Sequence, residues 1–355
     1  PPDNVVALRG LLLLPKTPLA LSLNGFSMTA TIRFAIAGCG LVSRYHHSAI
    51  KAVGHRGAHL AAVCTRERAN FHAVQSQFGA PCMDYQTLCD CTDVDVIAIC
   101  TASGAHAAQA MAAIRAGKHV MVEKPMATSL TDADAMIRVG EANQRLLAVT
   151  FQCRALPHFR RLKTFVDDGL LGKPLMASLV LPYQRTANYF DAAPWRGTWG
   201  MDGGGVLINQ GIHLIDLLIW LWGDPVETLA MTATRHQSIE TEDTAVVMLR
   251  LSSGAMATVT ATTAVSPGFA HRLVLSGTAG GIQIEGDRVV SCRFKDGGGA
   301  NLINGGGVSR PALTVDSKTA GHRSFYDNFL ASLTAGTPLI CDGREGRRSL
   351  TAILK

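Results

Sequence analysis

The sequence has no apolar stretch long enough to cross a membrane. Hydrophobic residues make up 47% of its 355 positions, yet no run reaches the ~18 consecutive apolar residues that a spanning helix needs. The leucine-rich segments Leu11–Leu14 and Leu19–Leu23 are split by Pro15 and Lys16, so they also make a poor secretory signal. We therefore expect a cytoplasmic protein without membrane contacts, and residues 1–30 as an extension that is disordered or added to the natural chain.

Long runs of basic residues are missing as well. The formal net charge is +6, but lysine and arginine are scattered along the chain. Nucleic-acid-binding proteins usually gather these residues in one patch or stripe. The charge is compatible with an anionic small molecule and gives little support for nucleic acid, so we predict no nucleic-acid partner.

The nine cysteines do not have the spacing of a disulfide or metal framework. The closest pair is Cys89 and Cys91, and neither a second pair nor a His-x-His sequence follows it. We expect reduced thiols that pack as small hydrophobic side chains, and no metal site.

Strands and helices alternate through the first 150 residues. The expected strands are continuous apolar runs without alternation, as is typical of strands covered on both faces; they are Ile32–Ala37, His59–Cys64, Val94–Cys100, His119–Val122 and Leu146–Thr150. Helical segments lie between most of them. This order predicts an α/β fold in which residues 31–152 form a doubly wound parallel sheet, the Rossmann domain that binds dinucleotides.

After Phe151 the pattern changes to strand-like runs with few helices between them. Pro174–Tyr183 and a series of runs from Val226 to Phe294 are the expected strands, several of them joined by glycine-containing turns. A strongly apolar helix is expected over Val206–Trp222. Residues 153–355 are therefore predicted to form a second α/β domain, with a mostly antiparallel open sheet that has helices on one face.

A glycine-rich turn follows the first predicted strand and opens a helix. In the Rossmann pattern the first glycine makes the turn, the second lets the backbone approach the pyrophosphate, and the helix N-terminus binds that group. Ser43 stands where a third glycine is usual. The predicted cofactor contacts in this turn are Gly38, Cys39, Gly40, Leu41 and Val42.

The second predicted strand has no carboxylate at its tip, where NAD-binding proteins commonly hold the ribose with Asp or Glu. Thr65 can donate to a phosphate and Arg66 can neutralise one, so the sequence favours NADP over NAD. In the alternative interpretation Arg66 is solvated and Glu67 binds the ribose. Thr101, after the strand that ends at Cys100, is a further predicted cofactor contact.

The strand His119–Val122 ends in Glu123, Lys124 and Pro125. Open α/β sheets bind their ligands at the carboxyl ends of the strands. Hydride removal from an alcohol needs a base for the hydroxyl proton and a cation near the developing oxyanion. A buried lysine serves both needs, because burial lowers its pKa, and we predict that Lys124 is catalytic.

Four motifs together resemble the Gfo/Idh/MocA oxidoreductases. They are AIAGCGLVS at 35–43, ICTASGAHAAQAMAAIRAGKHVMVEKPMA at 99–127, GGGVLINQGIHLIDLLIWLWGDP at 203–225 and HRSFYDNFLASLTAGTP at 322–338. The resemblance covers about residues 32–355. It implies hydride transfer between a nicotinamide and a carbinol carbon, usually of a sugar, cyclitol or nucleotide sugar. It also implies a homo-oligomer, a dimer or tetramer, that associates through the C-terminal sheet.

The resemblance implies that His213 is the second catalytic residue. Asn209, His213 and Asp216 recur at spacings of four and three and therefore share roughly one helix face. Many family members carry Asp where this chain has Asn209, although relatives that act on nucleotide sugars also tolerate Asn. Because Asn cannot take a proton, we expect Lys124 and His213 to transfer protons and Asn209 to bind the substrate.

Further contacts are predicted from residues that flank this pair. Glu123, Arg154, Trp195 and Arg196, together with Lys124, are the remaining cofactor candidates. The substrate candidates are Lys124, Gln152, Tyr183, Arg185, Asn209, His213 and Tyr326.

The sequence therefore predicts an NAD(P)-dependent dehydrogenase or reductase that acts on a CH–OH group of a carbohydrate-like substrate. One alternative is a glycosidase of the same family that keeps its cofactor and oxidises its substrate transiently. The other is a non-catalytic NADP-binding sensor. Lys124 and His213 argue against the sensor, because a binding protein has no use for a proton-transfer pair.

Overall fold

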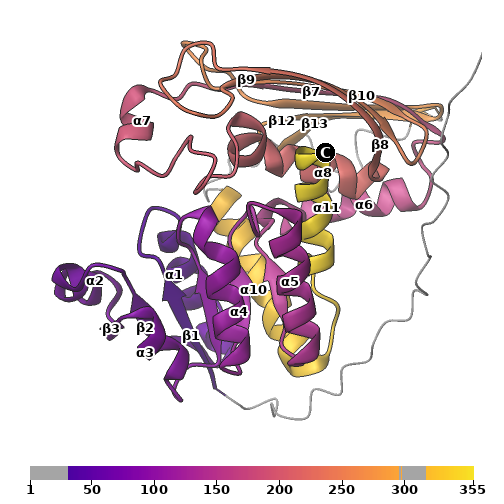
Figure 1. Ribbon diagram of the computed structural model, residues 1–355. Coiled ribbons are helices and arrows are strands. Elements are labelled where there is room, and N and C mark those ends of the chain that lie inside the picture. The colour runs from indigo at the N-terminus through magenta and orange to yellow at the C-terminus, as the bar shows by residue number, and fades with distance from the viewer. Residues whose placement is uncertain (1–30, 296, 298–316) are drawn as a thin grey trace, which may run out of the picture.

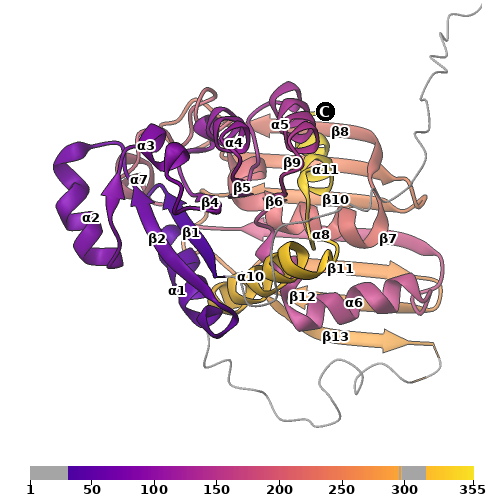
Figure 2. The same ribbon diagram turned by 90° about the horizontal axis from the view of Figure 1, so that it is seen from below.

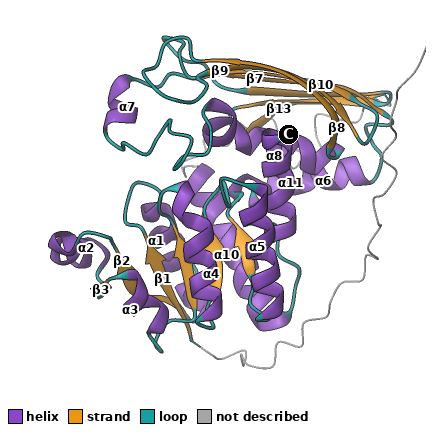
Figure 3. Ribbon diagram, in the orientation of Figure 1, coloured by secondary structure: helices purple, strands orange, loops and turns teal. Residues whose placement is uncertain are grey.

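The computed structural model describes residues 31–295, 297 and 317–355, so the expected extension at 1–30 lies outside the described residues. Two β-sheets lie in separate layers with helices between and around them (Figures 1 and 2). In Figure 3, which colours helices and strands differently, helices flank the first sheet, and the second sheet forms a broad layer along one side of the molecule.

The first sheet is parallel throughout and has the strand order β3-β2-β1-β4-β5-β6. Its strands are β1 (Ile32–Ala37), β2 (Ala58–Cys64), β3 (Cys82–Met83), β4 (Val96–Ile99), β5 (His119–Val122) and β6 (Leu147–Val149). Its helices are α1 (Ser43–Ala52), α2 (Phe71–Phe78), α3 (Tyr85–Asp90), α4 (His106–Arg115) and α5 (Leu130–Ala142). The doubly wound parallel sheet is confirmed. The sequence analysis did not identify β3 and α3, which are too short to show a period.

The second sheet has the order β13-β12-β11-β7-β10-β9-β8 and is antiparallel except where β7 pairs with β10. Its strands are β7 (Pro174–Pro182), β8 (Pro225–Ala233), β9 (Thr244–Leu251), β10 (Met256–Thr262), β11 (Arg272–Gly277), β12 (Gly280–Glu285) and β13 (Arg288–Phe294). Burial alternates along β9 and β10, because helices cover only one face. The mostly antiparallel sheet is therefore confirmed.

Helices α6 (Pro157–Asp167) and α8 (Ile212–Trp222) cover the inner face of this sheet (Figure 1). The expected single helix over 206–222 is wrong in one respect, since Leu207–Gly211 forms a π-helical turn before α8. The stretch between β7 and the π-helical turn contains the short helix α7 (Ala187–Asp191). Within the described part of the chain, no helix is long and apolar enough to cross a membrane.

The last two helices, α10 (Ser317–Ala335) and α11 (Gly343–Leu354), return to the first sheet. Phe325, Tyr326 and Phe329 of α10 belong to the same buried core as Phe34 of β1. Figure 2 shows these yellow helices beside the strands and helices of the N-terminal half. The expected division at residue 153 placed them in the second domain, whereas in the structure they complete the core of the first sheet.

Candidate active site

The glycine-rich turn lies at the carboxyl end of β1. Gly38 has φ +93°, and a Cβ there would lie 2.7 Å from the carbonyl carbon and oxygen of Cys100, so no side chain fits. Gly40 is exposed and has open space around its Cβ position. Helix α1 begins at Ser43 without a side-chain cap, so N–H groups at its N-terminus remain available to an anion. These features fit the pyrophosphate of a dinucleotide.

The tip of β2 carries an exposed ion pair. Arg66 Nε donates to Glu67 Oε1 at 2.8 Å, and the two side chains are 93% and 61% exposed. Arg66 was expected to bind a ribose phosphate, and Glu67 binds the ribose in the alternative interpretation. The two side chains lie side by side. Thr65 is half-buried next to them. Thr101 Oγ1 donates to Gln109 Oε1 at 2.6 Å, which fixes its side chain at the end of β4.

Lys124 lies directly after β5 and joins the two sheets. Its half-buried side chain donates from Nζ to the main-chain carbonyl oxygen of Asn209 at 2.7 Å. Burial lowers the pKa of Lys124 and outweighs the negative charges of Glu123 and Asp202, which raise it. The positive charges of Lys318 and Arg185 lower it further. A lysine with a lowered pKa exchanges protons more readily near working pH.

His213 lies in the first turn of α8, four residues after Asn209. Its ring is half-buried, and Nδ1 is buried without a hydrogen-bond partner among the described residues. The ring of Phe151 packs edge-on against it, with 6.1 Å between centroids. Burial holds the pKa of His213 well below its ordinary value, and the charge of Lys124 acts in the same direction. The imidazole is therefore neutral and can donate or accept a hydrogen bond.

Asp202 is a carboxylate in this site that the sequence analysis missed. Asn209 Nδ2 donates to both of its oxygens, at 2.8 and 2.9 Å, and the Gly197 N–H donates at 2.9 Å. Asp202 is buried, and burial raises its pKa. Its position just before the glycines 203–205 was the available signal. Asn209 is thus paired with a carboxylate that comes from the preceding loop.

The aromatic side chains of the loop after β7 alternate with arginines. The Arg185 guanidinium carbon lies 5.5 Å from the Tyr183 ring centroid and 5.1 Å from that of Tyr189. Arg196 lies 4.1 Å from the Tyr189 centroid and 5.5 Å from that of Trp195. The loop therefore brings together four residues for which we predicted cofactor or substrate contacts: Tyr183, Arg185, Trp195 and Arg196.

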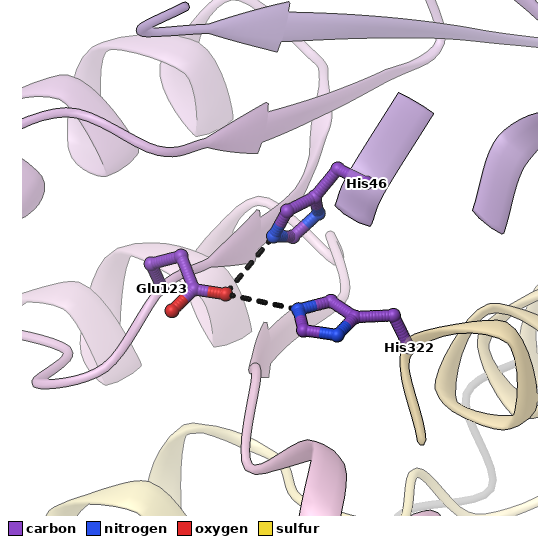
Figure 4. Close-up of side chains that lie close together, drawn as sticks. All are labelled: His46, Glu123 and His322. Atoms are coloured by element: carbon purple, nitrogen blue, oxygen red, sulfur yellow. Dashed lines mark hydrogen bonds and ion pairs between the residues drawn. The ribbon is translucent and has the colours of Figure 1, made fainter. Parts of the chain in front are cut away.

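Glu123 lies in a buried cluster with His46 and His322 (Figure 4). His46 Nε2 donates to Glu123 Oε1 at 2.9 Å, and His322 Nε2 lies 3.6 Å from the same oxygen. Burial opposes ionisation of Glu123, but the interactions with His322 and His46 outweigh it and hold the pKa well below its ordinary value. The nitrogen and oxygen atoms of these three side chains that could bind a metal ion lie within 4.8 Å of one another. The carboxylate, however, already accepts a hydrogen bond from His46. The arrangement is a hydrogen-bonded cluster that supports the backbone before Lys124.

Two predicted contacts are corrected by this cluster. Tyr326 is completely buried and its hydroxyl lies 2.9 Å from His46 Nδ1, so it orients His46 and does not reach a substrate. The side chain of Glu123 is engaged by the two histidines and does not face a cofactor. Both residues belong to the hydrogen-bonded cluster next to the backbone of Lys124.

Arg154 does not make the cofactor contact that the sequence predicted. It has no exposed surface, and its Nε and Nη2 donate to the two oxygens of Asp216 at 2.8 and 2.7 Å. Nη1 donates to Glu345 Oε2 at 2.8 Å. All three nitrogens are engaged inside the protein, so Arg154 joins α8 to α11 instead of contacting the cofactor. Gln152 is also largely buried, packed against Gly321 of α10.

The parallel sheet, its glycine-rich turn and the second sheet beside it define a dinucleotide-binding oxidoreductase. The profile described as "Oxidoreductase family, NAD-binding Rossmann fold" matches residues 32–151, and "GFO/IDH/MocA C-terminal domain" matches residues 159–283. The chain belongs to the Gfo/Idh/MocA family and is an NAD-binding dehydrogenase or reductase.

Several relatives are similar over three quarters of the chain or more. Inositol 2-dehydrogenase of Rhizobium meliloti is 25% identical over 332 residues, which are 90% of this chain and 94% of that protein. Inositol 2-dehydrogenase 2 of Saccharopolyspora erythraea is 29% identical over 275 residues, 75% of this chain and 76% of that one. The WlbA dehydrogenase from Bordetella pertussis, solved in complex with NADH and UDP-GlcNAcA, has 30% identity and a TM-score of 0.82, covering 92% and 95% of the two chains.

Proposed function

We propose that this protein transfers a hydride between a nicotinamide cofactor and a secondary alcohol or ketone of a sugar, a cyclitol or a derivative of one. The observation that carries the proposal is the convergence of Lys124, which follows β5, with Asn209 of the π-helical turn and His213 of α8. A proton-transfer pair at the carboxyl edge of a dinucleotide-binding sheet is the arrangement that alcohol oxidation needs.

In oxidation the substrate hydroxyl gives its proton to neutral Lys124 Nζ, and the neutral His213 ring hydrogen-bonds the same oxygen. The nicotinamide, when bound, supplies the hydride acceptor. In reduction the ammonium form of Lys124 returns the proton. Asn209 is held by Asp202, and its amide positions a neighbouring hydroxyl of the substrate. The lowered pKa of Lys124 suits both directions, because general acid–base catalysis works best near the operating pH.

Three observations support a polyhydroxylated substrate. Relatives that cover most of this chain are named for inositol, and the 30% identical WlbA dehydrogenase was solved with a nucleotide sugar. The loop of Tyr183, Arg185 and Tyr189 supplies aromatic and polar groups beside the catalytic pair. The cofactor is NAD or NADP, and the preference for NADP stays a prediction.

The test is to purify the protein, identify the nicotinamide that co-purifies, and follow absorbance at 340 nm with a panel of polyols, sugars and sugar nucleotides. We expect NAD(P)-dependent turnover of at least one of them, abolished in Lys124→Met. Cleavage of glycosides without a net change at 340 nm would support the hydrolase instead. A cofactor-bound protein that turns over no member of either panel would contradict the proposed activity.

A further inference from the structure

The loop after β7 presents two arginines, Arg185 and Arg196, that form no direct ion pair with a carboxylate of the described residues. Arg185 Nη1 donates only to the adjacent Gln184 carbonyl, and its Nε is buried without a hydrogen-bond partner among the described residues. Arg196 is similar, since Nη1 donates to the Tyr189 carbonyl and Nε is buried and unpartnered. Leaving a buried donor unsatisfied costs about 1–3 kcal/mol, and more when the group is charged, so such groups usually await a ligand or a water.

Arg185 is held firmly in place. Its N–H donates to the Thr263 carbonyl at 2.8 Å, and its own carbonyl accepts from Gln237 Nε2 at 2.7 Å. Its guanidinium lies between the rings of Tyr183 and Tyr189. The two tyrosines orient the group without neutralising it, which leaves a positioned donor with its charge intact.

The positive charge of Arg185 acts on Lys124, so the two side chains lie near each other. The Tyr189 hydroxyl, next to Arg185, lies 3.5 Å from Asn209 Oδ1, and the Asn209 carbonyl accepts from Lys124 Nζ. The two carboxylates nearest the pair are engaged elsewhere. Glu123 accepts from His46, and Asp202 accepts from Asn209. The charges of Glu123 and Asp202 oppose that of Arg185 at Lys124, but the Arg185 guanidinium itself forms no ion pair among the described residues.

We propose that Arg185 binds an anionic substituent of the substrate, a carboxylate or a phosphate, while the carbinol carbon lies at Lys124. Guanidinium binds either group with two parallel hydrogen bonds, which neutral sugars cannot provide. The cofactor pyrophosphate does not meet this need, because its place is the glycine-rich turn of the first sheet. The inference rests on the proposed function and narrows its substrates to acidic sugar derivatives such as uronates and sugar phosphates.

The test compares matched substrates with the holoenzyme. Glucose, galactose and N-acetylglucosamine are each assayed as the neutral sugar, the uronate and the 6-phosphate, which separates the two anionic groups. We expect kcat/KM to favour an anionic member of a set by about 10- to 100-fold, as expected for a charge-assisted pair. Arg185→Leu should remove that preference, because it should lower kcat/KM far more for the anionic members of each set than for the neutral member. Arg185→Lys should keep part of it.

Arg161→Leu is the matched control. That arginine also lies over an aromatic ring, 5.6 Å from the Phe165 centroid, but on α6, and its loss should leave the preference unchanged. Preference for neutral sugars, or an equal effect of Arg185→Leu on neutral and anionic members, overturns the inference and leaves the proposed function standing.

If nothing is turned over, the proposed function fails and binding decides the inference. With NADH or NADPH saturating, calorimetry should then show inorganic phosphate binding more weakly to Arg185→Leu than to the parent protein. Equal binding, or none to either protein, overturns the anion site.

Discussion

Lys124 Nζ donates to the main-chain carbonyl oxygen of Asn209 at 2.7 Å. The contact joins the end of β5 in the first sheet to the π-helical turn that leads into α8. π-Helical turns occur often at functional sites. Because the acceptor is a backbone atom, this contact does not depend on which side chain stands at position 209.

Substitutions of Lys124, His213 and Asn209 should change different kinetic constants. Lys124→Met and His213→Ala should each lower kcat by about 10²- to 10⁴-fold, the usual contribution of general acid–base catalysis. Asn209→Ala keeps its carbonyl and hence the contact with Lys124, so it should mainly raise KM. Steady-state kinetics with a substrate from the panel measures both. A loss of kcat in Asn209→Ala as large as that in His213→Ala would contradict this division.

The pH dependence of the reaction rate should report the protonation state of Lys124. Lys124 must be neutral to accept the hydroxyl proton, and burial lowers its pKa. Oxidation should therefore speed up as pH rises through a pKa below the ordinary lysine value of about 10.4, and reduction should slow over the same interval. Lys124→Arg cannot lose its proton and should abolish the rise. A flat profile in the parent enzyme between pH 6 and 10 would argue against Lys124 as the base.

The cofactor preference is tested at the tip of β2. If Arg66 binds a ribose phosphate, Arg66→Ala should raise KM for NADPH about tenfold or more, as expected for a charge-assisted contact, and leave KM for NADH unchanged. The pair with Glu67 is exposed and costs little to break. If Arg66→Ala has no effect and Glu67→Ala raises KM for NADH, the preference is for NAD.

Arg154 should matter for stability and little for cofactor affinity. Arg154→Met leaves the buried carboxylate of Asp216 without its partner, and breaking a buried pair in this way costs about 3–5 kcal/mol. We expect a fall in Tm of about 10 °C with nearly unchanged KM for NAD(P)H in the folded protein. Replacing both residues, as Arg154→Met with Asp216→Leu, should recover part of the loss. A raised cofactor KM with unchanged Tm would restore the cofactor role.

The outer face of the second sheet should be an interface between copies of the chain. It exposes apolar side chains on neighbouring strands, with Met231 opposite Val246 and Leu229 opposite Met248. Exposed apolar faces of this kind mark protein contacts. Light scattering should show a dimer or tetramer, and Met231→Asp with Met248→Asp should reduce its mass. Leu354→Asp on α11 is the control. An unchanged mass in the double variant would place the interface elsewhere.

The sequence predicted best where one physical signal dominates. Buried strands such as His119–Val122 read as short apolar runs, and the structure reproduces those limits. The roles of Arg154 and Tyr326 could not be read in this way, because an internal ion pair with Asp216 and a hydrogen bond to His46 join residues far apart in the chain. Asp202 was missed because its contact with Asn209 depends on the path of the loop between them, which the sequence pattern does not predict.

The buried cluster of Glu123 also bears on how the chain folds. His322 and Tyr326 lie on α10, near the end of the sequence, while Glu123 and His46 come from the first half. During synthesis Glu123 and His46 are made long before His322 and Tyr326. The support for Lys124 therefore forms only when nearly the whole protein has been made. A fragment that ends near residue 152 would lack the residues of α10 and α11 that pack into this core, and it would expose part of it.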